Sequence, residues 1–161
     1  MKDTLRLLLF WKCNLHCSYC CNEIPSVRKN ILPIKLEDIN FDNYKNICIS
    51  GGEPFLNPKL VYEIVSKTNK PVYIYSNGIK ITKDIEDKIS SFSNVKGINI
   101  GLHYPNTFDK IISKLKNNPL IRFHVEDIYK DSIEYKYSNI KFKYWKRNDC
   151  EMLNEDIRIL E

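Results

Sequence analysis

Three cysteines in one short segment are the residues of this chain best suited to redox chemistry. Cys13, Cys17 and Cys20 have the spacing C-x3-C-x2-C. Cysteine thiolates hold [4Fe–4S] cubes, and this spacing lets one loop reach three irons while the fourth iron has no protein ligand. A second unusual segment, Gly51-Gly52-Glu53-Pro54, follows a short apolar run. The combination predicts an iron–sulfur centre whose open iron binds another molecule.

Zinc is the main alternative, because Cys21 directly follows Cys20 and sites of four thiolates commonly bind zinc. Adjacent cysteines reach one tetrahedral ion with difficulty, and structural zinc usually takes two separated pairs, of which only one exists here. We therefore favour a cluster and expect Cys21 to be a packed or shielded thiol. Cys48 lies in an apolar run and is expected to be inert packing. Cys150 lies in a polar segment, where a substrate contact or a hydrogen-atom donor is the alternative to packing.

The cysteine spacing, the aromatic Tyr19 before the third cysteine and the later GGEP segment resemble the radical S-adenosylmethionine (SAM) superfamily. The resemblance implies one [4Fe–4S] cluster on the three cysteines, with SAM bound to the fourth iron through its amino and carboxylate groups. Ser76-Asn77-Gly78 is similar to the Thr-Asn-Gly of that family, although an ordinary turn is the alternative. By resemblance, the SAM-binding residues are Tyr19, Gly51, Gly52, Glu53, Pro54, Ser76, Asn77 and His103. Glu53 is expected to hold its loop, and His124 is expected to be structural.

The same resemblance implies a reaction. A reduced cluster would cleave SAM to a 5′-deoxyadenosyl radical, which would abstract hydrogen from a small-molecule, nucleotide or peptide substrate. An electron donor such as flavodoxin or ferredoxin is then implied, as is sensitivity to oxygen. No residue is assigned as catalytic. Two alternatives stay open, an activase that makes a glycyl radical on a partner protein and a non-enzymatic iron–sulfur or zinc module.

The elements that position these residues alternate between short apolar strands and helices. Strands are expected at Thr4–Phe10, Ile47–Ser50, Pro71–Tyr75, Gly97–Gly101, Ile121–Val125 and Ile140–Trp145. Helices are expected after the N-cap residues Asn57, Thr82 and Asn106, with a short helix near Leu36–Ile39. Alternating elements imply parallel strands and right-handed crossovers. A closed eight-unit barrel needs about 250 residues, so we predict an incomplete (β/α)6-type barrel, a partial TIM barrel.

In such a barrel the chemistry lies at the carboxyl ends of the strands. The cysteine loop, GGEP, Ser76-Asn77 and His103 each follow one predicted strand, so we expect them to share one mouth. The polar segment from Arg147 to Cys150 is expected there too.

Length and composition limit the remaining classes. The chain of 161 residues is long enough for one domain, and we expect a single core domain over 1–161. No stretch approaches the roughly twenty apolar residues of a membrane helix, and cysteine usage indicates a reducing compartment, so a cytoplasmic protein is expected. The charge of +5 comes from dispersed lysines and is no specific nucleic-acid signal. Lys141-Phe142-Lys143-Tyr144 is compatible with a phosphate partner, but the alternation favours a sheet edge with lysines on one face.

Overall fold

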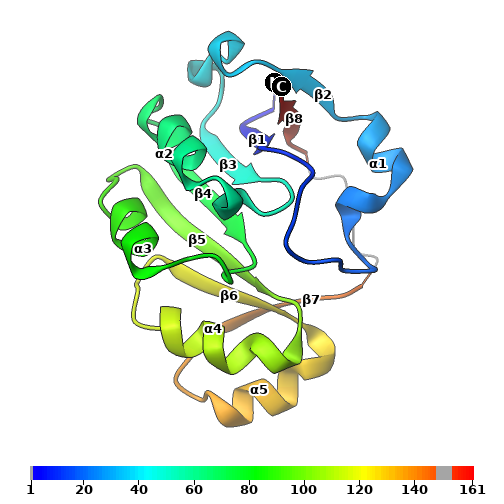
Figure 1. Ribbon diagram of the computed structural model, residues 1–161, viewed down its shortest axis with the longest axis vertical. Coiled ribbons are helices and arrows are strands. Elements are labelled where there is room, and N and C mark those ends of the chain that lie inside the picture. The colour runs from blue at the N-terminus through cyan, green and yellow to red at the C-terminus, as the bar shows by residue number, and fades with distance from the viewer. Residues whose placement is uncertain (1, 148–153) are drawn as a thin grey trace.

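The computed structural model describes residues 2–147 and 154–161. In this part of the chain, eight strands form one sheet in the order β2-β8-β1-β3-β4-β5-β6-β7, and each pair of neighbours is parallel (Figure 1). The strands are β1 (Thr4–Leu8), β2 (Leu32–Ile34), β3 (Asn46–Ser50), β4 (Val72–Ser76), β5 (Val95–Leu102), β6 (Ile121–Glu126), β7 (Phe142–Trp145) and β8 (Asp156–Leu160). Because β2 and β7 lie at the ends of this order, the described sheet is not closed. The prediction of a partial parallel α/β barrel is confirmed.

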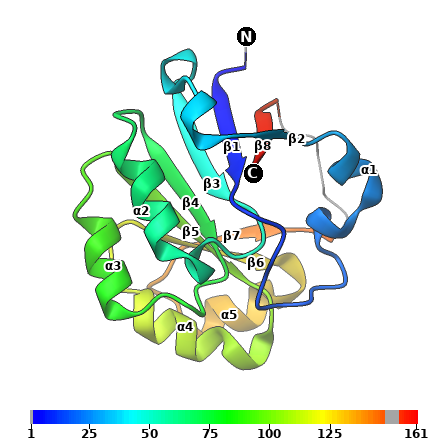
Figure 2. The ribbon, with the colours of Figure 1, turned by 45° about the horizontal axis from the view of Figure 1, so that its top comes forward.

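Five α-helices occur in the described residues. They are α1 (Pro25–Lys29), α2 (Pro58–Ser66), α3 (Lys83–Ser90), α4 (Phe108–Leu115) and α5 (Lys130–Lys136). Figures 1 and 2 show α2, α3, α4 and α5 grouped along one side of the sheet, whereas α1 lies apart from them, beside the loop that follows β1. None of the helices in the described residues is both long and apolar enough to cross a bilayer.

The two faces of the sheet differ in polarity because strand side chains alternate between faces. Leu5, Leu7, Ile47, Ile49 and Ile74 are fully buried in the core beneath the helices. The intervening positions form polar rows on the other face, which the register places side by side. One row contains Arg6, Cys48, Tyr73 and Gly97, the next Tyr75, Asn99 and Arg122, and a third Gly101, His124 and Lys143.

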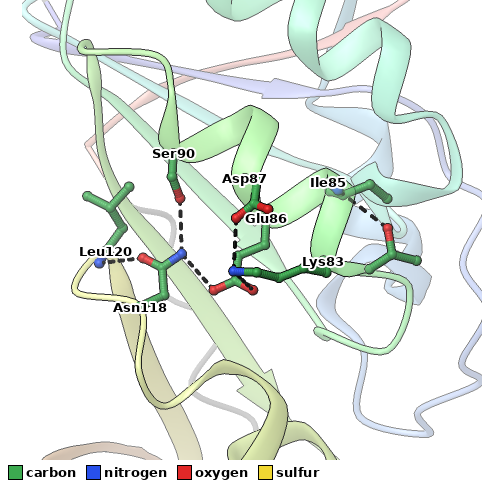
Figure 3. Close-up of polar contacts among 8 residues, drawn as sticks. Lys83, Ile85, Glu86, Asp87, Ser90, Asn118 and Leu120 are labelled. Atoms are coloured by element: carbon green, nitrogen blue, oxygen red, sulfur yellow. Dashed lines mark hydrogen bonds and ion pairs between the residues drawn. The ribbon is translucent and has the colours of Figure 1, made fainter.

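A partly exposed polar network attaches α3 to the loop before β6 (Figure 3). The side-chain amide of Asn118 donates to Glu86 Oε1 at 2.9 Å and to Ser90 Oγ at 3.0 Å. Its Oδ1 accepts a hydrogen bond from Leu120 N at 2.9 Å. Lys83 forms ion pairs with Glu86 and Asp87 on the same helix. The network fixes where the chain leaves α4 and enters β6.

All six predicted strands occur in the predicted order, but two strands and two helices were not predicted. The missed strands are β2 and β8, and the missed helices are α1 and α5. β2 is three residues long and contains Pro33, and β8 is defined by pairing with both β2 and β1. Both segments therefore form strands because they pair with segments far away in the sequence.

The capping predictions had mixed outcomes. Asn57 accepts a hydrogen bond from Leu60 N at 3.3 Å, and Thr82 accepts one from Ile85 N at 3.4 Å, so these two N-caps are confirmed. The N-cap at Asn106 is wrong, because Asn106 lies in a 3-10 turn, Pro105–Thr107, and α4 begins at Phe108. A 3-10 turn at Leu36–Asp38 stands where the short helix was expected. β7 is an edge strand with Lys143 exposed and Phe142 packed against Phe123, as the alternation predicted.

Candidate functional site

The loops after β1, β3, β4 and β5 enclose one cleft of about 590 Å³ at the carboxyl ends of the strands. Residues predicted from sequence line it from each of these loops, namely Cys13, Cys17, Tyr19, Cys20, Gly51, Gly52, Ser76, Asn77 and His103. Glu53 and Pro54 are buried behind the lining. The structure therefore brings most of the candidate residues together and leaves these two outside the cleft.

The cysteine loop has no regular secondary structure and is held by a few polar contacts. Cys20 N donates to Cys17 O at 3.1 Å, and Leu15 N donates to Cys13 Sγ at 3.4 Å. Asn77 on the loop after β4 donates to Asn14 Oδ1 at 2.8 Å. This last contact ties the cysteine loop to the end of β4, two strands away in the sheet.

The three thiols suit a cluster. Cys13, Cys17 and Cys20 are all half-buried and free of disulfides. Burial raises the pKa of Cys13, as do the charges of Glu53, Cys17 and Cys20, while the hydrogen bond from Leu15 N lowers it. Bound iron lowers the pKa of such thiols because it binds the thiolate form.

No group of three or more His, Cys, Asp or Glu side chains surrounds a single metal position anywhere in residues 2–147 and 154–161. A cube does not need such convergence, because each thiolate binds a different iron. The donor set of three neighbouring free thiols on one loop therefore fits a [4Fe–4S] cluster.

The glycines of the GGEP segment allow two stretches of backbone to pair closely. Gly52 N donates to Phe10 O at 2.7 Å, and Glu53 N donates to Lys12 O at 2.9 Å. Gly51 has φ +123, and a Cβ on Gly52 would lie 1.8 Å from Lys12 O. The missing side chains are thus needed for contact between this segment and the start of the cysteine loop.

The side chain of Asn22 also contacts this segment, donating to Gly51 O at 2.7 Å. Sequence reasoning missed Asn22, because a lone asparagine after a cysteine has no signal of its own.

Glu53 joins the GGEP segment to the loop after β4. Its buried carboxylate accepts hydrogen bonds from Ser76 Oγ and Asn77 N, each at 2.8 Å, and from Phe55 N at 3.1 Å. Burial raises the pKa of Glu53, and these three hydrogen bonds oppose that rise. With its oxygens engaged, Glu53 acts on the site by positioning Ser76 and Asn77.

A cluster of aromatic side chains covers the cleft beside the cysteines. The ring of Trp145 lies 5.3 Å from that of Tyr19 and 5.9 Å from that of His103, measured between centroids. Tyr19 Oη lies 3.3 Å from both Nδ1 and the carbonyl oxygen of His103. Arg147 stacks over Tyr19 at 4.6 Å and pairs with the buried Glu126, Nε to Oε1, at 2.7 Å. Trp145 was not assigned to the site from the sequence.

The other histidine and cysteine predictions had different outcomes. His124, expected to be structural, lines the cleft, and its Nε2 lies 3.1 Å from Asn99 Oδ1. Burial lowers the pKa of His103, so this imidazole is neutral at pH 7. Burial also raises the pKa of the Cys48 thiol to about 11. Cys21 lines the cleft and takes part in a disulfide, so the expectation of a thiol at this position is wrong. Cys150 lies outside the described residues.

Comparison with known proteins identifies a family match and two similar proteins. Residues 9–135 match the family model described as the Radical SAM superfamily. A 7-carboxy-7-deazaguanine synthase from Methanospirillum hungatei JF-1 is 30% identical over 120 residues, which cover 70% of this chain and 49% of that protein. A 7-carboxy-7-deazaguanine synthase from Haemophilus influenzae is 33% identical over 73 residues, covering 44% of this chain and 35% of that protein. The chain thus spans about half or less of the length of these relatives.

The fold has a solved counterpart. The crystal structure of selenomethionine BtrN in an open conformation superposes with a TM-score of 0.54 and 18% identity, covering 81% of this chain and 59% of that one. At this level of identity, the likeness concerns the fold.

Proposed function

Because the chain belongs to the radical SAM superfamily, which uses a [4Fe–4S] cluster and SAM, we propose that it cleaves SAM reductively and abstracts a hydrogen atom from a small-molecule substrate. The observation that carries this proposal is the single cleft that joins the three cysteines to Gly51, Gly52 and the loop after β4. In parallel barrels the active site lies at the carboxyl ends of the strands, which is where this cleft lies. We also propose that residues 1–161 act as one core domain.

The chain's own residues have distinct parts in this proposal. Cys13, Cys17 and Cys20 hold the cluster, and the backbone of Gly51 and Gly52 faces the cleft where the ammonium group of SAM is expected. When bound, the cluster and SAM together supply one-electron cleavage of the C5′–S bond and hydrogen-atom transfer from substrate, yielding methionine and 5′-deoxyadenosine, with the electron taken from a ferredoxin or flavodoxin.

The residues around the cleft bind and shield SAM. Asn77 projects from the strand end that Glu53 positions, and we assign it with Ser76 to the carboxylate or ribose of SAM. Tyr19 and His103 form the aromatic side on which the adenine packs. Trp145 and Arg147 cover this side and exclude water from the reaction.

A small molecule is the favoured substrate. The relatives from Methanospirillum hungatei and Haemophilus influenzae are named for the synthesis of 7-carboxy-7-deazaguanine, a small heterocycle. The cleft is bounded by side chains from several strand ends, which suits enclosure of a small ligand.

The test is anaerobic reconstitution with iron and sulfide, followed by incubation with SAM and dithionite. We expect about four irons and four sulfides per chain and slow formation of 5′-deoxyadenosine and methionine, measured by mass spectrometry. Alanine at Cys13, Cys17 or Cys20 should abolish the cluster spectrum and product formation. Cys48→Ala is the matched control and should retain both, because Cys48 lies in the strand β3, outside the cleft lining. Zinc bound tightly in anaerobically purified protein, with no cluster on reconstitution, would contradict the proposal.

A further inference from the structure

A second cavity, of about 310 Å³, lies along the polar face of the sheet. It adjoins the cleft at the strand ends where we propose that SAM binds, which we call the cofactor cleft. Tyr75, Asn99 and His124 line both spaces, so the two lie side by side. The strand β5 lies between β4 and β6 (Figure 1) and has glycine on either side of Asn99, at Gly97 and Gly101. A Cβ at Gly97 would meet the side chain of Arg122 at 3.1 Å, and one at Gly101 would meet that of His103 at 2.6 Å, so both glycines make room for neighbouring side chains.

Two cations line this cavity without a carboxylate partner. Arg122 on β6 and Lys143 on β7 take part in no ion pair within the described residues. Arg122 Nη2 donates to Lys96 O at 3.3 Å, and its guanidinium lies 5.6 Å from the ring centre of Tyr73. Glu155 is the lining carboxylate, and it already forms a two-pronged pair with Arg6. The cavity therefore has unbalanced positive charge.

The two cations lie on the same face of neighbouring strands. Lys143 is paired in register with His124, and Arg122 precedes His124 by two residues, so all three side chains share one face. Burial lowers the pKa of His124 to about 4, helped by the charges of Lys143 and Arg122. Like charges on adjacent strands repel each other, and an anion bound between them would remove that repulsion.

We propose that the substrate carries an anionic group, a carboxylate or a phosphate, which Arg122 and Lys143 bind in this second cavity. The inference rests on the proposed function, because it supplies the substrate of the same site. With the anion held there, the rest of the substrate extends past Asn99 and Tyr75 toward the cofactor cleft. Asn99 and His124 already share a hydrogen bond at this junction and offer polar groups to it.

The test is anaerobic equilibrium dialysis of the reconstituted protein with SAM present, using radiolabelled inorganic phosphate in one arm and radiolabelled benzoate in the other. Ionic strength is held constant with chloride, so that general screening does not change. We expect saturable binding of one anion per chain. Binding of phosphate alone supports a phosphorylated substrate, binding of benzoate alone supports a carboxylate, and binding of both supports an anion site that accepts either.

Three variants make the assignment specific. Arg122→Gln/Lys143→Gln should raise the dissociation constant about tenfold or more, because two charge-assisted contacts are lost. Arg122→Lys/Lys143→Arg keeps both charges and should bind within a few-fold of the original protein. The matched control Lys59→Gln/Lys116→Gln removes two charges from exposed positions outside the cavity and should leave binding unchanged.

Absence of binding by either anion, or binding that survives in Arg122→Gln/Lys143→Gln, would overturn the inference. This failure is distinguishable from failure of the proposed function. A protein that forms 5′-deoxyadenosine but binds no anion contradicts the anion site alone. A protein that binds anions as expected but never cleaves SAM contradicts the proposed function.

Discussion

Gly52 shows how one missing side chain connects two parts of the site. Its backbone N–H bonds to Phe10 O, and the position a Cβ would take is 1.8 Å from the backbone oxygen of Lys12. Lys12 immediately precedes Cys13, which we propose as a cluster ligand. A side chain at Gly52 would therefore displace the start of the cysteine loop as well as crowd the cleft.

Gly52→Ala should therefore reduce iron content as well as SAM cleavage. We expect a loss of about 1–3 kcal/mol in the free energy of unfolding from overpacking, together with less iron per chain after anaerobic reconstitution. Iron analysis and urea unfolding measure the two effects. Gly97→Ala is the control, because its Cβ would meet the movable end of Arg122 at 3.1 Å. Full iron content and normal stability in Gly52→Ala would contradict this account of the loop.

His124 is the second residue for which the structure predicts a measurable effect, because its surroundings lower its pKa. Its pKa is lowered to about 4 by burial, Lys143 and Arg122, and the ring also contacts Tyr75 and Asn99. The unfolded chain takes up a proton on this histidine below about pH 6.5, whereas the folded chain does so only near pH 4. Protonation therefore favours the unfolded state as the pH falls through this range.

The stability that His124 supplies should be present above about pH 6.5 and lost as the pH falls toward 4. Allowing for solvent screening of a partly exposed ring, we expect the original protein to lose about 1 kcal/mol more than His124→Gln between pH 7 and pH 5. Urea unfolding of both proteins under nitrogen at the two pH values measures this difference. Parallel losses in the two proteins would show that His124 does not titrate as the structure predicts.

At the scale of elements, the position of the site depends on the helix caps and loop contacts that fix the ends of the strands. The helices α2 and α3 begin at side-chain caps, Asn57 and Thr82. Glu53 then ties the loop after β3 to the end of β4. The hydrogen bonds of Asn118 make a similar connection away from the cleft, between α3 and the start of β6 (Figure 3).

Asn118→Ala removes three hydrogen bonds and leaves Glu86 Oε1 without the amide that Asn118 donates to it. Glu86 is buried, so we expect a loss of about 1–3 kcal/mol in the free energy of unfolding, measured with urea. The neighbouring Asn117 is exposed, which makes Asn117→Ala a matched control with little expected effect. Because the network is remote from the cleft lining, iron content should stay normal in both variants. Equal stability of the two variants would refute a structural role for Asn118.

For the whole molecule, the open sheet leaves one polar face uncovered by α2 to α5, and both cavities lie along it. Two enzyme classes differ in what such a shape would bind: one encloses a small molecule, and the other acts on a partner protein. The enclosing residues Trp145, Arg147 and Tyr19 gather at one end of this face, around the cofactor cleft. This closure favours the small molecule.

An extract of small molecules should therefore stimulate formation of 5′-deoxyadenosine by the reconstituted protein at least several-fold, read out by mass spectrometry. A protein fraction depleted of small molecules serves as the comparison and should not stimulate it. A glycyl radical that appears on a partner protein, detected by electron paramagnetic resonance, would instead identify an activase. That result would leave the cluster and SAM assignments unchanged.

The sequence by itself determined the family and the main order of the fold. The spacing of Cys13, Cys17 and Cys20 is local, and six strands have their own apolar runs, so both could be predicted without knowing what lies beside them. The family and the partial barrel followed from these patterns, and both are confirmed. The SAM contacts inferred by resemblance remain predictions.

Only the tertiary structure decided the features that depend on distant partners. β8 exists as a strand because β1 and β2 pair with it, and Glu53 lies behind the cleft because Ser76 and Asn77 bind its carboxylate. The sheet register likewise brings Lys143 on β7 to the face that carries Arg122 and His124 on β6. Such contacts join residues far apart in the sequence, so no local pattern of spacing or hydrophobicity records them.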